Sequence, residues 1–169
     1  MTTTNFDLDG FLSAFGTKDV DAVLDFLTDD VVVIDAGSGE ELEGREQVRQ
    51  LLREMKEAVR TVVIEPELVL HGHAALAVLA RVHLVRGRDM AIPEGSSVPV
   101  GGRTVDLTGA FFATLDEQGH ITRLTRVADR RMALRELGLS RGQKAGASVE
   151  LLEFIRPDVH GPGPTATYP

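Results

Sequence analysis

The chain has 169 residues, 43% of them hydrophobic, and a formal net charge of −8. This length and apolar fraction suffice for a single-domain core and exclude a disorder-type composition. The negative charge disfavours nucleic acid and anionic membrane surfaces as partners. Because cysteine is absent, disulfides, thiolate catalysis and cysteine metal sites are excluded. The sequence shows neither a signal-peptide pattern nor an apolar run of roughly 18 residues, so we expect a cytoplasmic protein without a membrane span.

Apolar residues at helical spacing predict two helices near the start of the chain. Asp7 is a suitable N-cap for the first, and we expect Gly16 to end it in a left-handed turn. A second, shorter helix is predicted after Asp19. The β-branched run 31–34 predicts the first strand, and a third, strongly amphipathic helix is predicted over residues 45–59.

Four strand-like segments follow the helices and are joined by short turns or a polar loop. They cover residues 61–70, 74–85, 103–115 and 121–128. No helical crossover separates them, which favours antiparallel pairing over a parallel βαβ fold. A last helix is predicted from Asp129 to Leu137. The order of elements predicts an α+β fold with helices packed on one face of an antiparallel sheet.

The character of the sequence changes near its end, which divides the chain into two predicted parts. Residues 1–139 form the folded domain. Residues 140–169 form a C-terminal extension, in which residues 148–155 are compatible with one more short element. We expect the proline-rich last ten residues to be flexible.

Three stretches carry a resemblance to a known superfamily. They are FLSAFGTKDVDAVLDFLTDDVVVIDAGSGEELEGREQV, PEGSSVPVGGRTVDLTG and GHITRLTRVADRRMALRELGL. Their motifs resemble those of the nuclear transport factor 2-like superfamily (cystatin-like α+β barrels), and the last stretch is most similar to SnoaL-like polyketide cyclases. The resemblance implies a cone-shaped α+β barrel, in which helices pack on the concave face of a curved antiparallel sheet around a pocket for a small apolar molecule.

Asp35 is the first candidate catalytic residue. Its place at the end of the first strand is similar to that of the general base in ketosteroid isomerases. Alternatively, this aspartate precedes a glycine and hydrogen-bonds its own backbone in a turn. Phe11 stands where those isomerases have an oxyanion tyrosine, and their second donor falls near Ala110. Neither side chain can donate a hydrogen bond, so ketosteroid isomerase activity is not expected.

Arg81 and His83 lie two residues apart on a predicted strand and therefore share a face with Ala77 and Leu79. The stretch resembles limonene epoxide hydrolases, which carry Arg-x-Asp there. His83 takes the place of that aspartate, and Arg126 takes the place of their second catalytic aspartate, which argues against epoxide hydrolysis. We expect His83 to shuttle a proton and Arg81 to bind an anion or a carbonyl. The alternatives are a satisfied core histidine or one on an exposed edge, and a structural ion pair of Arg81 with Asp129 or Asp106.

Asp129 matches the acid/base aspartate of the cyclases, and it also stands where the N-cap of the last helix belongs. Asp106 is expected to face solvent. The two histidines His71 and His73 are a weak metal signal because no third ligand is near in sequence. We therefore expect no metal site and no cofactor.

The sequence thus predicts a SnoaL-like enzyme that performs cyclisation or aldol-type acid/base chemistry on a polyketide or similar apolar carbonyl compound. The expected catalytic residues are Asp35, His83 and Asp129, and the expected substrate contacts are Arg81, Phe11, Phe15 and Arg126. The alternatives are a non-catalytic small-ligand-binding module and an isomerase or dehydratase of the same superfamily. Because strand 74–85 is apolar on both faces, we also expect a homodimer. A cavity shared by Arg81, His83 and either Asp35 or Asp129 would favour an enzyme.

Overall fold

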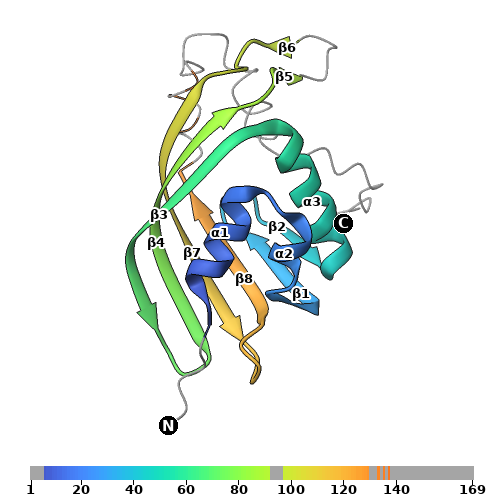
Figure 1. The fold of residues 1–169 in the computed structure, drawn as a ribbon, viewed down its shortest axis with the longest axis vertical. Coiled ribbons are helices and arrows are strands. Elements are labelled where there is room, and N and C mark those ends of the chain that lie inside the picture. The colour runs from blue at the N-terminus through green and yellow to red at the C-terminus, as the bar shows by residue number, and fades with distance from the viewer. Residues whose placement is uncertain (1–5, 92–96, 130–132, 134, 136, 138–169) are drawn as a thin grey trace, which may run out of the picture.

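The structure is a computed structural model, and it describes residues 6–91, 97–129, 133, 135 and 137. Helices precede or interrupt the strands along the described part of the chain (Figure 1). The elements are α1 (Leu8–Thr17), α2 (Val20–Leu24), β1 (Leu27–Asp35), β2 (Glu40–Glu43), α3 (Arg45–Ala58), β3 (Val59–His71), β4 (Ala75–Arg86), β5 (Met90–Ala91), β6 (Ser97–Val98), β7 (Thr104–Leu115) and β8 (Ile121–Ala128).

Six strands form one curved, unclosed sheet in the order β2-β1-β8-β7-β4-β3. Neighbouring strands are antiparallel except β1 and β8, which are parallel. Figure 1 shows α1, α2 and α3 on the same side of this sheet. The expected α+β fold is therefore confirmed, and the first and last strands along the chain, β1 and β8, lie side by side in the sheet.

Each strand presents one side chain to the helices and the next to the opposite side of the sheet. On β4, Leu76, Val78 and Ala80 are buried under the helices, whereas Leu79 is exposed. We call the helix-covered side the inner face and the other side the outer face. Phe11 of α1 reaches the inner face, where its ring meets Phe111 of β7.

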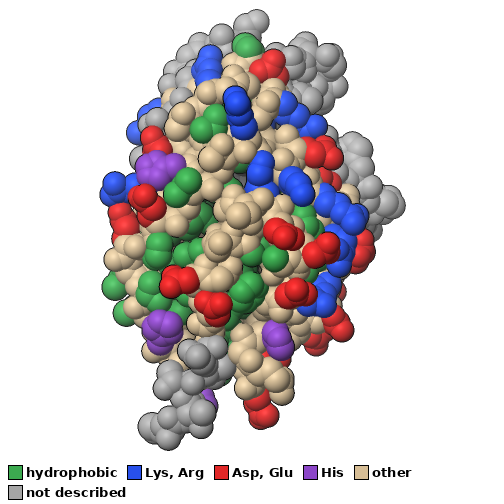
Figure 2. Space-filling view, viewed as in Figure 1, with side chains coloured by type: hydrophobic (Ala, Val, Ile, Leu, Met, Phe, Trp, Pro, Cys, Tyr) green, Lys and Arg blue, Asp and Glu red, His purple; other side chains and the backbone are tan. Residues whose placement is uncertain are grey.

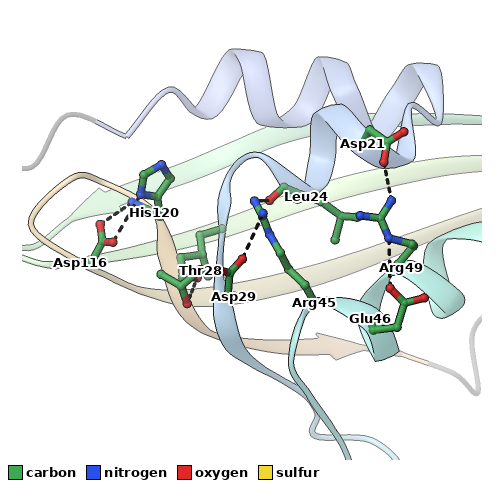
Figure 3. Close-up of polar contacts among 10 residues, drawn as sticks. Asp21, Leu24, Thr28, Asp29, Arg45, Glu46, Arg49, Asp116 and His120 are labelled. Atoms are coloured by element: carbon green, nitrogen blue, oxygen red, sulfur yellow. Dashed lines mark hydrogen bonds and ion pairs between the residues drawn. The ribbon is translucent and has the colours of Figure 1, made fainter.

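Helix α3 has an apolar side that faces the sheet and a charged side that faces solvent. Figure 2 shows basic and acidic side chains gathered over α3. Two of its arginines fasten it to the preceding elements (Figure 3). Arg45 bonds the carbonyl oxygen of Leu24 and forms an ion pair with Asp29, and Arg49 forms an ion pair with Asp21.

The prediction for the end of the first helix is wrong. Gly16 lies inside α1, and Lys18 is the residue that adopts the left-handed conformation, with φ of 57°. A left-handed residue other than glycine costs about 1–2 kcal/mol. The Lys18 ammonium offsets this cost by donating hydrogen bonds to the carbonyl oxygens of Val59 and Arg60 at 2.9 and 2.8 Å.

The four-residue strand β2 was not predicted, and β1 begins four residues before the predicted start of the first strand, at Leu27. The polar loop predicted between the second and third of the four strand-like segments contains the short pair β5 and β6. The bounds of β8 agree with the prediction, and those of β3, β4 and β7 differ from it by one or two residues.

The part of the chain after β8 is described in only a few residues. Ala133 and Arg135 are helical, and the Ala133 N–H donates to the Asp129 carbonyl, as expected for a helix that begins there. The proposed extension 140–169 lies outside the described residues. Among the residues that are described, no helix has the length and apolar character needed to cross a membrane.

Candidate functional site

Asp35, the last residue of β1, is the one charged side chain among the described residues that is buried, with 8% of its surface exposed. Its Oδ1 accepts hydrogen bonds from the backbone N–H groups of Gly37 and Ser38 at 2.9 and 3.0 Å. Asp35 therefore makes the backbone hydrogen bonds of a turn, which was the alternative interpretation of this residue. These bonds fix the carboxylate on the inner face and offset part of the cost of burying a charge.

Arg126 of β8 lies beside Asp35, because the parallel pairing of β1 with β8 places these two residues opposite each other. Its Nε is 2.9 Å from Asp35 Oδ2, and its side chain is 33% exposed. Two residues expected to belong to the site are thus brought together as an ion pair.

A small cavity adjoins this ion pair. It has a volume of about 10 Å³ and is lined by Val33, Asp35, Glu40, Leu42 and Arg126. A space of this size is on the order of one water molecule. Its polar walls can receive a single oxygen atom, whether of water or of a ligand.

Phe11 and Phe15, two expected ligand contacts, lie on α1 at the inner face. Phe11 is buried, and its ring centroid is 6.0 Å from that of Phe111. Phe111 in turn stands opposite Arg126 in the pairing of β7 with β8. Phe15 is half-buried against the core. The aromatic side chains therefore form an apolar wall next to the ion pair.

Arg81 and His83 share a face with Ala77 and Leu79, as predicted, but that face is the outer one. Val78 and Ala80 alternate with them and are buried under the helices. The side chains of Arg81 and His83 are 56% and 39% exposed. The prediction that they share an inner cavity with Asp35 is therefore wrong, because the register of β4 turns its larger aliphatic residues inward.

On the outer face, Arg81 and His83 contact carboxylates of neighbouring strands. Arg81 forms an ion pair with Glu67 at 2.7 Å, and not with the expected aspartates. The His83 ring lies between Asp106, which it contacts through Nδ1, and Glu65, which is 3.5 Å from Nε2. Asp106 is half exposed, as expected. These contacts are consistent with a structural role for both residues.

Comparison of the chain with known protein families and structures identifies its family and supports its fold. A family model described as a SnoaL-like domain matches residues 8–124. The chain belongs to the SnoaL-like family. A search of curated proteins found no match for this SnoaL-like protein.

Solved structures of similar proteins share the fold. A candidate polyketide cyclase from Xanthomonas campestris is 25% identical, with a TM-score of 0.66 over 77% of this chain and 93% of that one. An LEH-like epoxide hydrolase from M. tuberculosis is 22% identical, with a TM-score of 0.60 over 77% and 85%. A candidate polyketide cyclase from Streptomyces antibioticus is 16% identical, with a TM-score of 0.64 over 78% and 95%. The family and its enzyme-like neighbours support an enzyme role at the family level.

Two acidic residues of this SnoaL-like domain, Asp129 and Glu40, lie on or next to strands of the site. Asp129 follows β8 and is exposed, and its backbone carbonyl accepts a hydrogen bond from the Ala133 N–H. Glu40 lines the cavity beside Asp35 and was not predicted, because the strand β2 that carries it was not predicted. In the described part of the chain, no group of three or more His, Asp or Glu side chains is arranged to hold a metal ion.

Proposed function

We propose that this SnoaL-like protein is an enzyme that performs acid/base chemistry on a small, apolar carbonyl compound of the polyketide kind. The observation that carries the proposal is the ion pair of the buried Asp35 with the half-buried Arg126 on the inner face, next to an apolar aromatic wall. A charged pair in such surroundings is expensive to bury, which favours a role beyond stability. Active sites typically combine a few converging polar or charged groups with apolar walls.

The chemistry that suits this arrangement is removal of a proton from a carbon next to a carbonyl group. A carboxylate of the site takes the proton as the C–H bond breaks, and the electron pair moves onto the carbonyl oxygen. Arg126 stabilises the resulting enolate oxygen. In a cyclisation, the enolate carbon then bonds to a second carbonyl carbon of the same molecule, and that oxygen receives the proton. No redox step occurs, so the reaction needs no oxidant or reductant.

The remaining predicted residues take different parts in the proposal. Phe11 and Phe15 contact the apolar body of the ligand, and Asp129, three residues after Arg126, is a second candidate proton donor. Arg81 and His83 are left out because they lie on the outer face.

A non-catalytic binding module is the second candidate function. It is favoured by the contacts of Asp35, since both of its carboxylate oxygens already have partners within the chain. In that case the ion pair would orient a bound carbonyl without moving a proton.

Hydrogen exchange in 2-tetralone, an apolar ketone, distinguishes the two functions. Proton NMR in D₂O would follow loss of the signals next to its carbonyl group. We expect the protein to accelerate exchange, and Arg126→Gln to lower the rate by ~10²–10³, a typical effect of removing one stabilising donor. Arg53→Gln, on the exposed side of α3, is the control and should leave the rate unchanged. Binding of the probe without accelerated exchange would contradict the enzyme and favour the binding module.

We also propose that the outer face joins two copies of the chain. Six large apolar side chains are exposed there, from four adjacent strands: Val63, Leu68, Leu70, Leu79, Phe112 and Val127. Exposed patches of this kind mark interaction surfaces. Arg123 and Glu43 lie on the same face in register with Val32, and neither has an ion-pair partner among the described residues. A face that carries both an unpaired cation and an unpaired anion among its described residues can be complementary to itself across a two-fold axis, which favours a second copy as the occupant.

A further inference from the structure

Glu40 stands in a row of three charged side chains that crosses three strands of the sheet. It is opposite Asp35 in the antiparallel pair of β2 and β1, and Asp35 is opposite Arg126 in the pair of β1 and β8. The next inward-facing residues on the same two strands, Leu42 and Val33, are also paired and are buried. Glu40 therefore projects from the inner face, and its Cβ lies about 4.5–5.5 Å from that of Asp35, the usual spacing across a pair.

The two carboxylates differ in how far their oxygens are already engaged. Asp35 accepts two backbone N–H groups and is paired with Arg126. The half-buried carboxylate of Glu40 has no hydrogen bond or ion pair with the residues that the structure describes. The backbone N–H of Glu40 donates to Ser38 Oγ at 3.3 Å, and the residue is paired with Asp35 in the sheet. The turn thus fixes the backbone of Glu40 while its carboxylate stays available to exchange a proton.

The arginine of the row supplies a second, independent sign that an oxygen atom belongs between these groups. Arg126 Nε is buried and makes no hydrogen bond of good geometry within the described residues, although it lies 2.9 Å from Asp35 Oδ2. A buried N–H group without an acceptor is unfavourable and rare. The cavity of about 10 Å³ beside it has room for one oxygen atom.

We propose that Glu40 is the general base of the site, that the cavity seats the carbonyl oxygen of the ligand, and that Asp35 is a positioning residue. This inference rests on the proposed function. In the forward step, the C–H bond next to the carbonyl breaks, and the proton forms an O–H bond on the Glu40 carboxylate. The electron pair moves to the oxygen in the cavity, where Arg126 balances its negative charge. In the reverse step Glu40 returns a proton, so the residue is regenerated.

Asp35 acts through Arg126 and does not take the proton. Its Oδ1 accepts two backbone N–H groups and its Oδ2 lies against the Arg126 guanidinium, so both carboxylate oxygens are engaged. Its part is to hold Arg126 against the cavity. The carboxylate of Glu40 has no such contacts with the described residues and is therefore the one placed to take the proton.

The test is exchange of 2-tetralone in D₂O with Glu40→Gln, Glu41→Gln and Asp35→Asn. Glu41 is the matched control, since it is the next residue on β2 and projects from the opposite face. We expect Glu40→Gln to lower the exchange rate by ~10²–10⁴, the usual contribution of a general base, with the dissociation constant for the probe changed less than threefold. Glu41→Gln should match the unchanged protein, and melting curves show whether each variant is folded.

The outcomes separate this inference from the function on which it rests. A folded Glu40→Gln variant with full exchange activity, combined with an inactive Asp35→Asn variant, would overturn Glu40 as the base and leave the enzyme in place. Asp35→Asn should instead weaken binding of the probe and retain a measurable rate. If the unchanged protein does not accelerate exchange at all, the proposed function fails, and the role of Glu40 fails with it.

Discussion

At the scale of single residues, the candidate site consists of side chains that are distant in sequence and are brought into contact by strand pairing. Asp35 and Arg126 were singled out separately in the sequence, 91 positions apart. Their contact depends on the parallel pairing of β1 with β8, and no local sequence pattern predicts that pairing. Glu40 was missed because the strand β2 that carries it was not predicted. Strand alternation did place Arg81 and His83 on one face, but it could not decide which face the helices cover, since both faces of β4 are apolar.

Asp116 gives a prediction about pH. Partial burial opposes its ionisation, but hydrogen bonds from the His120 backbone and ring and from the Gln118 backbone outweigh this and lower the pKa of Asp116. Figure 3 shows the contact of Asp116 with His120. A lowered pKa stabilises the fold above the ordinary aspartate pKa of about 3.9, and this stabilisation is lost as the pH falls through the lower folded value.

We therefore expect Asp116→Asn to melt at a lower temperature than the unchanged protein at pH 5, with the difference shrinking as the pH falls towards 2.5. Melting curves by circular dichroism across this range check it. A difference that stays constant or grows on acidification would show that the ionised carboxylate adds no stability.

At the scale of elements, the long periodic segments were predictable and the short ones were not. The amphipathic pattern of α3 and the alternation of β3, β4, β7 and β8 extend over enough residues to identify each element. Strand β2 has four residues, three of them glutamate, and depends on its pairing with β1. The end of α1 was mistaken because Lys18 takes the left-handed cap position, and its ammonium is held by carbonyl oxygens of Val59 and Arg60, which are distant in sequence.

Substitutions of two glycines near helix ends are expected to change the free energy of unfolding in opposite directions. Gly16 lies within α1, and a Cβ there would be 3.6 Å from the Val62 carbonyl oxygen, an ordinary contact. Gly16→Ala should raise the free energy of unfolding by about 0.5–1 kcal/mol. Gly44 precedes α3 with φ of 81°, so Gly44→Ala should lower it by about 1–2 kcal/mol. Urea titrations measure both values. Destabilisation by Gly16→Ala would restore Gly16 as the left-handed end of the helix.

At the scale of the whole molecule, the sheet separates two surfaces with different uses. The inner face is covered by helices and carries the proposed reaction centre. The outer face exposes apolar side chains from four strands and carries the proposed contact between copies. The family and fold were predictable because motifs in three separate stretches carry the resemblance, and the family model matches residues 8–124. The substrate was not, because many chemistries share one fold.

We expect the protein to be a dimer at micromolar concentration, as measured by light scattering after size-exclusion chromatography. Phe112→Lys places a charge in the middle of the outer face and should produce a monomer, because a buried unpaired charge is unfavourable. Gln118→Lys adds the same charge in the exposed turn between β7 and β8 and should leave the dimer intact. A monomer for the unchanged protein would refute the proposed contact.

The central claim is that the ligand binds at the inner face beside Asp35, and amide chemical shifts test it most directly. Titration of ¹⁵N-labelled protein with 2-tetralone should shift the amide signals of Gly37 and Ser38, whose N–H groups bind the Asp35 carboxylate. The amides of Ala77 and Phe112, whose side chains project from the outer face, should not move. Shifts at Ala77 and Phe112 with none at Gly37 and Ser38 would place the ligand on the outer face and contradict the claim.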